Sequence, residues 1–154
     1  MANQVIYQYS TVITAASDTN TVAAGSYSVA SASVALTSTN HFNYPMGDFS
    51  LFHSASASVS SASNTVLLFR RDINIDGGTN DGPVPITSGS SPYSNTFVGA
   101  FTVPAYTAAS SSYVSLTDIP ITKECEFYIQ NSTNQPIAGS WVLKFTPKTW
   151  APGA

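Results

Sequence analysis

Three oxygen-bearing side chains stand at alternate positions in "DINIDGGTND" (72–81), the most charged stretch of the chain. Asp72, Asn74 and Asp76 could offer three ligands to Ca²⁺, and the glycines that follow could make the sharp turn of a calcium loop. The ligand set is incomplete, because Pro83 stands at the twelfth position, where an EF-hand-type loop carries a bidentate glutamate. The competing interpretation is a strand that ends in a hairpin turn, with the intervening isoleucines pointing inward. We favour the hairpin and keep a calcium site as the alternative.

The other residue types that could support catalysis or zinc binding are few and scattered. His41 and His53 do not have the close, paired spacing of zinc ligands. Cys125 alternates with Phe127 and Ile129, which predicts a small buried hydrophobic residue rather than a nucleophile. The chain contains no G-x-S-x-G motif. We therefore expect no catalytic residues and no enzymatic activity.

Two further polar motifs have ordinary structural interpretations. Asp118 could form a surface ion pair with Lys123, which would contribute about 1 kcal/mol or less. The "NST" at 131–133 matches a glycosylation sequon, but turn chemistry explains it without a secreted protein. Neither motif indicates a functional site.

The composition excludes several classes of protein. Charged residues make up 8% of the 154 residues, against about 25% in a typical globular protein. The net charge is −3 and no basic stripe is present, so nucleic acid is not an expected partner. No apolar run is long enough to span a membrane, and the first residues do not have the pattern of a signal peptide. We expect synthesis in a cytosol.

The secondary structure that carries these candidate residues should be β-strands. Apolar and polar residues alternate with a period of two, and good helix formers are scarce. Turn residues separate these segments throughout the chain. The pattern predicts an all-β fold, an antiparallel β-sandwich or jelly roll, as a single domain over 1–154 with about eight strands. The expected strands cover 5–15, 26–36, 49–54, 65–75, 95–103, 112–119, 125–131 and 139–147.

Aromatic residues near both ends of the chain are candidates for an interface. We expect the last strand to end at 147 and an extended tail to cover 147–154, in which Trp150 either folds back or docks on a neighbour. The segment 5–13, with Tyr7 and Tyr9, could be an edge strand that pairs with another chain. Tyr and Trp are enriched at protein interfaces, so we assign Tyr7, Tyr9 and Trp150 to an interface.

The segment 116–150 resembles the C-terminal region of small head decoration proteins of tailed bacteriophages. The resemblance is carried by "TDIPIT", "KECEFYIQN", "NQPIAGSW" and "KFTPKTW". It implies a cement protein that binds the major capsid protein shell on the exterior of the virion, often as a homotrimer, after assembly in the host cytoplasm. The family has no catalytic residues to assign to this chain.

Two other classes remain open. A glycan-binding domain, or a tail or fibre adhesion module of a virion, could stack sugars on exposed tyrosines such as Tyr93 and Tyr106. A glycosidase or cysteine hydrolase would have to use residues such as Glu126 or Cys125. A symmetric structural protein without substrate turnover fits the composition better.

Overall fold

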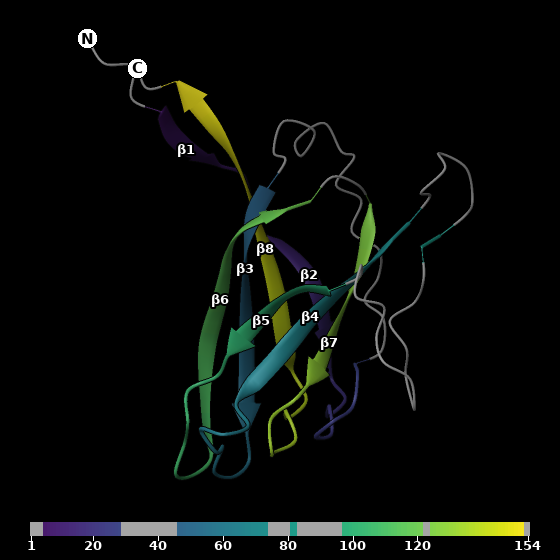
Figure 1. Cartoon of the computed structure of the whole chain (residues 1–154), viewed down its shortest axis with the longest axis vertical. Coiled ribbons are helices and arrows are strands. Elements are labelled where there is room, and N and C mark those ends of the chain that lie inside the picture. Colours follow the sequence, from purple (N-terminus) through teal and green to yellow (C-terminus); the bar gives the residue numbers. More distant parts are fainter. Residues whose placement is uncertain (1–4, 29–45, 74–80, 83–96, 122–123, 153–154) are drawn as a thin grey trace.

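The computed structural model describes residues 5–28, 46–73, 81–82, 97–121 and 124–152. Within these residues the chain is all-β, with eight strands in two antiparallel sheets that pack as a β-sandwich (Figure 1). The predicted fold class is therefore confirmed. The described part of the chain has no helix that could cross a membrane.

The two sheets differ in size and in how far they extend. The larger sheet has the order β1-β8-β3-β6, and β2 also pairs with β8. The smaller sheet has the order β5-β4-β7. The strands are β1 (Val5–Tyr9), β2 (Ile13–Asp18), β3 (Met46–Ala55), β4 (Thr65–Asp72), β5 (Phe97–Thr102), β6 (Ser110–Pro120), β7 (Cys125–Asn131) and β8 (Trp141–Pro152).

The core forms where the apolar faces of the two sheets meet. In β8 the alternation places Trp141, Leu143 and Phe145 in the core, each at most 1% exposed. Phe49 of β3 packs edge-on against Phe127 of β7 across the sandwich, with ring centroids 5.0 Å apart. Each such side chain contributes about 1.5–3 kcal/mol when buried. The described core is therefore built from apolar side chains that both sheets contribute.

Strand β7 has the predicted bounds and the predicted buried face. Cys125, Phe127 and Ile129 are all at most 1% exposed. The opposite face is less open than the alternation predicts, because Tyr128 is only 4% exposed. Its hydroxyl donates a hydrogen bond of 2.9 Å to Oε2 of Glu126. The smaller sheet is thus partly covered on its second face.

The predicted strand 5–15 is two strands, β1 and β2, on the same edge of β8. Tyr9 lies opposite Lys148, whereas Ile13 lies opposite Phe145, so four steps on one strand match three on the other. The extra residue lies in the break at 10–12, which belongs to neither strand. Most of the predicted strand 26–36 lies outside the described residues.

The expected tail 147–154 is wrong for its first six residues, because β8 continues to Pro152. A proline inside a strand needs an explanation, since it cannot donate a ladder hydrogen bond. Pro147 lies opposite Ser10, in the break between β1 and β2, and its carbonyl accepts a hydrogen bond of 2.9 Å from the Ser10 amide. The proline therefore lies at the break between β1 and β2, where the ladder with β8 is interrupted.

The turn after β7 is organised by one buried amide. The side chain of Asn131 is fully buried and donates to the carbonyls of Val22 (2.9 Å) and Gln135 (2.7 Å). Its Oδ1 accepts hydrogen bonds from the amide and hydroxyl of Thr133. The "NST" motif is therefore turn chemistry, as predicted.

Candidate interaction surface

The most exposed apolar element is a two-stranded ribbon at one end of the sandwich. It consists of β1 and the end of β8, with Val5–Tyr9 paired to Lys148–Pro152, and is called the aromatic ribbon below. Figure 1 shows it extending beyond the rest of the sandwich, as one end of the larger sheet. Tyr7, Tyr9 and Trp150 are 41%, 53% and 51% exposed. The three predicted interface residues thus lie on one structural element.

The aromatic side chains of the ribbon contact one another on one face. Tyr7 lies directly opposite Trp150, and their ring centroids are 4.4 Å apart. Tyr9 lies two residues along β1 on the same face, with its ring centroid 6.4 Å from that of Tyr7. The opposite face carries Ile6, which is 49% exposed. The expected docking of Trp150 is therefore partly internal, onto Tyr7, and leaves half of the indole open.

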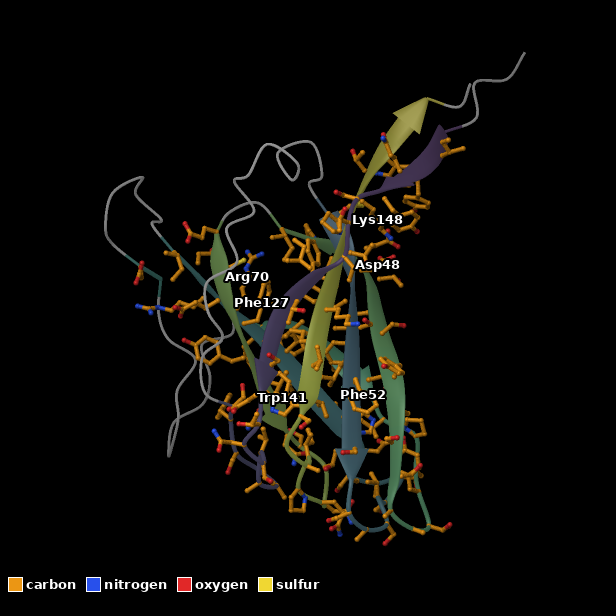
Figure 2. The ribbon with its side chains drawn as sticks, turned by 180° about the vertical axis from the view of Figure 1, so that it is seen from behind. Asp48, Phe52, Arg70, Phe127, Trp141 and Lys148 are labelled. Carbon is orange, nitrogen blue, oxygen red and sulfur yellow. The ribbon has the colours of Figure 1, made fainter. Side chains whose placement is uncertain are left out.

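A buried lysine lies where the ribbon leaves the body of the protein. Nζ of Lys148 is 2.6 Å from Oδ1 of Asp48 and 2.8 Å from Oδ1 of Asp118. The same ammonium lies 4.7 Å from the centroid of the Tyr7 ring, which covers it in a cation–π contact. Only 3% of the Lys148 side chain is exposed. We call Asp48, Asp118 and Lys148 the junction cluster (Figure 2 labels Lys148 and Asp48).

A bulge in β6 turns Asp118 towards this cluster. Between the pairs Gly47–Ile119 and Phe49–Leu116, β6 has one residue more than β3. Asp118 lies in this irregularity with a φ of 59°, a conformation that aspartate tolerates better than most residues. Its amide donates a hydrogen bond of 3.0 Å to Oδ1 of Asp48. Lys123, the expected partner of Asp118, lies outside the described residues. Within them, Asp118 forms its ion pair with Lys148.

The electrostatics of the junction cluster favour the charged lysine. Burial by itself lowers the pKa of Lys148, but hydrogen bonds and charges from Asp118 and Asp48 outweigh it and raise the pKa above its usual value. The cluster holds one cation and two carboxylates, so the base of the ribbon has no excess positive charge. Lys148 is consequently a structural anchor and not a free basic group.

A smaller apolar patch lies on the outer face of the larger sheet. Phe52 of β3 is opposite both Tyr113 of β6 and Val142 of β8. The Phe52 and Tyr113 ring centroids are 5.0 Å apart, and Tyr113 is 69% exposed. Val142, Lys148 and Trp150 are separated by even numbers of residues in β8, so their side chains lie on the same face of the strand. The outer patch therefore shares this face with the aromatic side of the ribbon.

The predicted calcium ligands are only partly within the described residues. Asp72 forms an ion pair with Arg70, with Nε and Oδ1 3.3 Å apart, and Asn74 and Asp76 lie outside the description. The amide of Gly82 donates a hydrogen bond of 2.7 Å to the carbonyl of Asp72, so the chain returns to the end of β4. No group of three potential metal ligands occurs among the described residues.

The described histidine and the cysteine occupy the interior. Nε2 of His53 lies 2.9 Å from Oγ of Ser112, and burial lowers the pKa of the imidazole. Burial also raises the pKa of the Cys125 thiol to about 12. A buried, protonated thiol is a poor nucleophile, which agrees with the predicted packing role. His41 lies outside the described residues.

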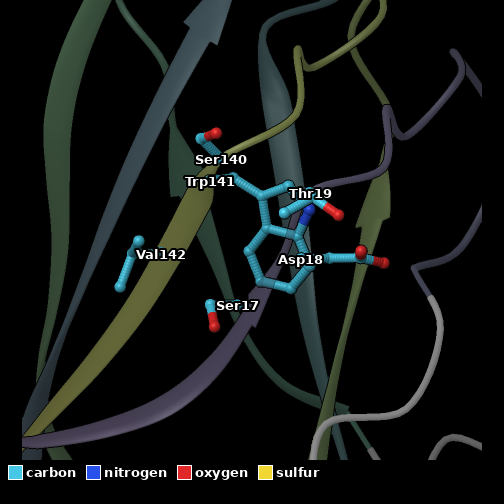
Figure 3. Close-up of a pocket in the computed structure, with 6 residues that line it drawn as sticks. All are labelled: Ser17, Asp18, Thr19, Ser140, Trp141 and Val142. Atoms are coloured by element: carbon cyan, nitrogen blue, oxygen red, sulfur yellow. The ribbon is translucent and has the colours of Figure 1, made fainter.

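An open hollow of about 430 Å³ lies between the end of β2 and the start of β8 (Figure 3). The indole of Trp141 forms part of its wall but is only 1% exposed, so it offers no open stacking face. Oδ1 of Asp18 accepts two hydrogen bonds from Asn20. The lining has one carboxylate and no histidine, and therefore no acid–base pair. The lining residues are Ser17, Asp18, Thr19, Ser140, Trp141 and Val142.

Of the two tyrosines considered for sugar stacking, the structure describes Tyr106, which is only partly exposed. The hydroxyl of Tyr106 is buried and has no hydrogen-bond partner among the described residues. The centroid of its ring lies 6.1 Å from that of the His53 imidazole. Tyr93 lies outside the described residues. Among the described residues the exposed aromatic side chains are those of the ribbon, Tyr113 of the outer patch and Phe97 at the start of β5, which is 47% exposed.

Sequence reasoning missed the junction cluster and the outer patch. The partners in both come from strands far apart in the chain, and nothing local in the sequence reports that pairing. The chain matches no protein family, no curated protein and no solved structure.

Proposed function

We propose that this chain is a structural virion protein that decorates and stabilises a bacteriophage capsid. It binds the shell of the major capsid protein on its exterior, as a symmetric oligomer for which a trimer is favoured. The observation that carries the proposal is the aromatic ribbon, which presents Tyr7, Tyr9 and Trp150 together on an element that projects from the body.

The chemistry of the ribbon supports binding by contact area. Tyr and Trp are enriched among the residues that dominate protein interfaces, and they lose little conformational entropy on binding. Tyr7 and Trp150 already hold each other at 4.4 Å, so less ordering is needed when a partner covers them. Lys148, the only charged residue in the ribbon, is neutralised at its base. A neutral, aromatic arm is suited to an apolar or hydrogen-bonding surface.

The resemblance to head decoration proteins involves the same part of the molecule. The segment 116–150 includes the end of β6, all of β7 and most of β8, which contributes core residues and the Trp150 side of the ribbon. Low charge and many Ser and Thr residues also suit a protein that packs among repeated copies of a shell. On such a shell many modest contacts add through avidity.

The test uses shells assembled from a bacteriophage major capsid protein, taken from the same genome as this chain. The wild-type chain should co-sediment with the shells and raise the temperature at which they rupture. Trp150→Ala should weaken binding by about 30-fold to 1,000-fold, the range expected for an interface hot spot of about 2–4 kcal/mol. Tyr113→Ala, which removes an exposed aromatic outside the ribbon, is the matched control and should retain binding. A wild-type chain that fails to co-sediment would refute the proposal.

A glycan-binding or tail or fibre adhesion module is the second candidate, because Tyr113 is 69% exposed beside Phe52. An open tyrosine ring next to a second aromatic could stack on a sugar. A glycan array would separate the two candidates. Binding that is lost in Tyr113→Ala but kept in Trp150→Ala would favour the glycan module.

A further inference from the structure

Among the described strands, β1 has one edge without a partner strand. In the larger sheet β1 pairs only with β8 and forms the end of the strand order. Its five residues, "VIYQY", contain no charged residue and no proline. Natural edge strands usually carry such residues to prevent pairing with another chain. A two-stranded ribbon is also only marginally stable in water, and a further strand would stabilise it.

The backbone groups that face this open edge follow from one hydrogen bond. The amide of Ser10 donates to the carbonyl of Pro147, so the backbone of Ser10 faces β8. In an antiparallel ladder the facing direction alternates from residue to residue. With the uninterrupted register from Tyr9–Lys148 to Val5–Pro152, the amides and carbonyls of Val5, Tyr7 and Tyr9 face outward.

This set of outward groups is self-complementary. We infer that β1 pairs antiparallel with β1 of a second copy of this chain, around a two-fold axis that passes between the two Tyr7 residues. Tyr7 then exchanges both backbone hydrogen bonds with its counterpart, and Val5 does the same with Tyr9 of the second copy. All six outward groups are satisfied by this single register, and the larger sheet becomes continuous through both copies.

The side chains agree with the same arrangement. Trp150 and Tyr7 are neighbours across the β1–β8 pair, so two-fold pairing gives an unbroken row of four aromatic rings across four strands. No charge of β1 lies near the axis. The nearest cation, Lys148, is held by Asp48 and Asp118 in each copy and does not oppose the approach.

The contact is small. Five residues per copy is far fewer than the about 20 to 30 per side of a stable interface, so the pair is weak in dilute solution. High local concentration, as on the surface of a shell, would populate it. The inference does not rest on the proposed function, because it follows from the edge of β1 alone. A two-fold contact of this kind does not form the proposed trimer and would instead join copies from neighbouring trimers.

Cysteine cross-linking can capture this weak pair. In the inferred register two Tyr7 Cα atoms are about 5.5 Å apart, which a disulfide can span. Ile6→Cys is the matched control, because it is exposed on the same strand but its two copies are about 8 Å apart on the diagonal. Tyr7→Cys should therefore dimerise at least about tenfold faster under mild oxidation. The native Cys125 is 1% exposed and contributes little background.

A second pair of variants tests whether the backbone makes the contact. In the Tyr7→Cys background, Tyr9→Pro removes an outward amide and no β1–β8 hydrogen bond, whereas Tyr9→Ala removes the ring and keeps that amide. Disulfide cross-linking should be lost in the variant that carries Tyr9→Pro and kept in the variant that carries Tyr9→Ala. Equal cross-linking of Tyr7→Cys and Ile6→Cys, or of the proline and alanine variants, would overturn the inference. A chain that cross-links as expected but does not bind shells would keep the inference and refute only the capsid role.

Discussion

Nζ of Lys148 in β8 lies 2.8 Å from Oδ1 of Asp118 in β6, although β3 separates the two strands in the sheet. The lysine side chain extends across Asp48 of β3, which it contacts at 2.6 Å, and reaches a bulge that turns Asp118 towards it. Three strands are thus tied together at the place where β8 leaves the sandwich. This tie fixes the base of the aromatic ribbon.

Lys148→Met should destabilise the protein by about 3 kcal/mol. The substitution leaves Asp48 and Asp118 without their cation, and breaking a buried ion pair costs about 3–5 kcal/mol. The lower end applies because Asp118 is half exposed. Urea denaturation would measure the free energy of unfolding. Lys144→Met, on an exposed lysine of the same strand, is the control and should change it by less than about 0.5 kcal/mol. Equal losses in the two variants would contradict a structural role for the cluster.

The thiol of Cys125 should make the protein sensitive to alkali. Its pKa rises from an ordinary 9.0 to about 12, first because of burial, with Asp72 and Glu124 adding to the shift and Arg70 opposing it. Because the folded-state pKa is the higher one, the stabilising contribution is fully present below pH 9 and is lost as the pH rises to 12. The loss from this group reaches about 1.4 kcal/mol at pH 10.

Cys125→Ala should reduce this loss of stability between pH 8 and pH 10, whatever its effect at neutral pH. Denaturant titrations of both proteins across this pH range would show the difference in slope. Parallel pH profiles for the two proteins would show that the thiol does not ionise on unfolding as expected.

Asn131→Ala should cost about 3 kcal/mol or more. The substitution leaves the buried amide of Thr133 without the Asn131 oxygen, and a buried group left unpaired costs about 1–3 kcal/mol. It also removes one of two hydrogen bonds to each of the carbonyls of Val22 and Gln135, which keep those from the amide of Ile137 and the hydroxyl of Thr133, at about 0.5–1.5 kcal/mol for each bond lost. Thermal unfolding would detect the change. Asn20→Ala removes an exposed amide that bonds only to Asp18, and should have little effect. A small effect at both positions would argue against the buried network as a stabilising element.

The two tryptophans should separate in a quenching experiment. Trp141 is 1% exposed and Trp150 is 51% exposed, so acrylamide should quench one component of the emission readily and the other poorly. Binding to shells, or pairing through β1, should protect the accessible component. Trp150→Phe should remove that component and leave the protected one. An accessible fraction that survives this substitution would contradict the placement of Trp150.

The sequence predicted the sandwich well for strands that have one face in the core and the other towards solvent. Alternation identified β7 with its observed bounds and the buried face of β8, because a period of two directly reports which side of a strand lacks water. It failed at 10–12, because the break between β1 and β2 occurs within a stretch whose composition is that of a strand. It also failed at Pro147, because the break in β1–β2 that accommodates the proline is set by a partner strand more than a hundred residues away.

The candidate surface was predicted in its residues but not in its geometry. Tyr7, Tyr9 and Trp150 were assigned to an interface from residue type, whereas their contact depends on the pairing of β1 with the end of β8. The burial of Lys148 could not be predicted, since its two partners come from β3 and from an irregular part of β6. Long-range register is the information that local patterns do not contain.

The break at residues 10–12 divides the segment that pairs with one edge of β8 into two strands, β1 and β2. Each strand can therefore separate from β8 without the other. Strand β2 is backed by the core through Ala15 and Ala16, both nearly inaccessible to water, whereas β1 has no such support. Amide protons of Ile6 and Gln8 should therefore exchange with deuterated solvent much faster than those inside β2, as a distinct local unfolding unit. The sandwich would then stay folded while β1 repeatedly separates from the end of β8 and pairs with it again.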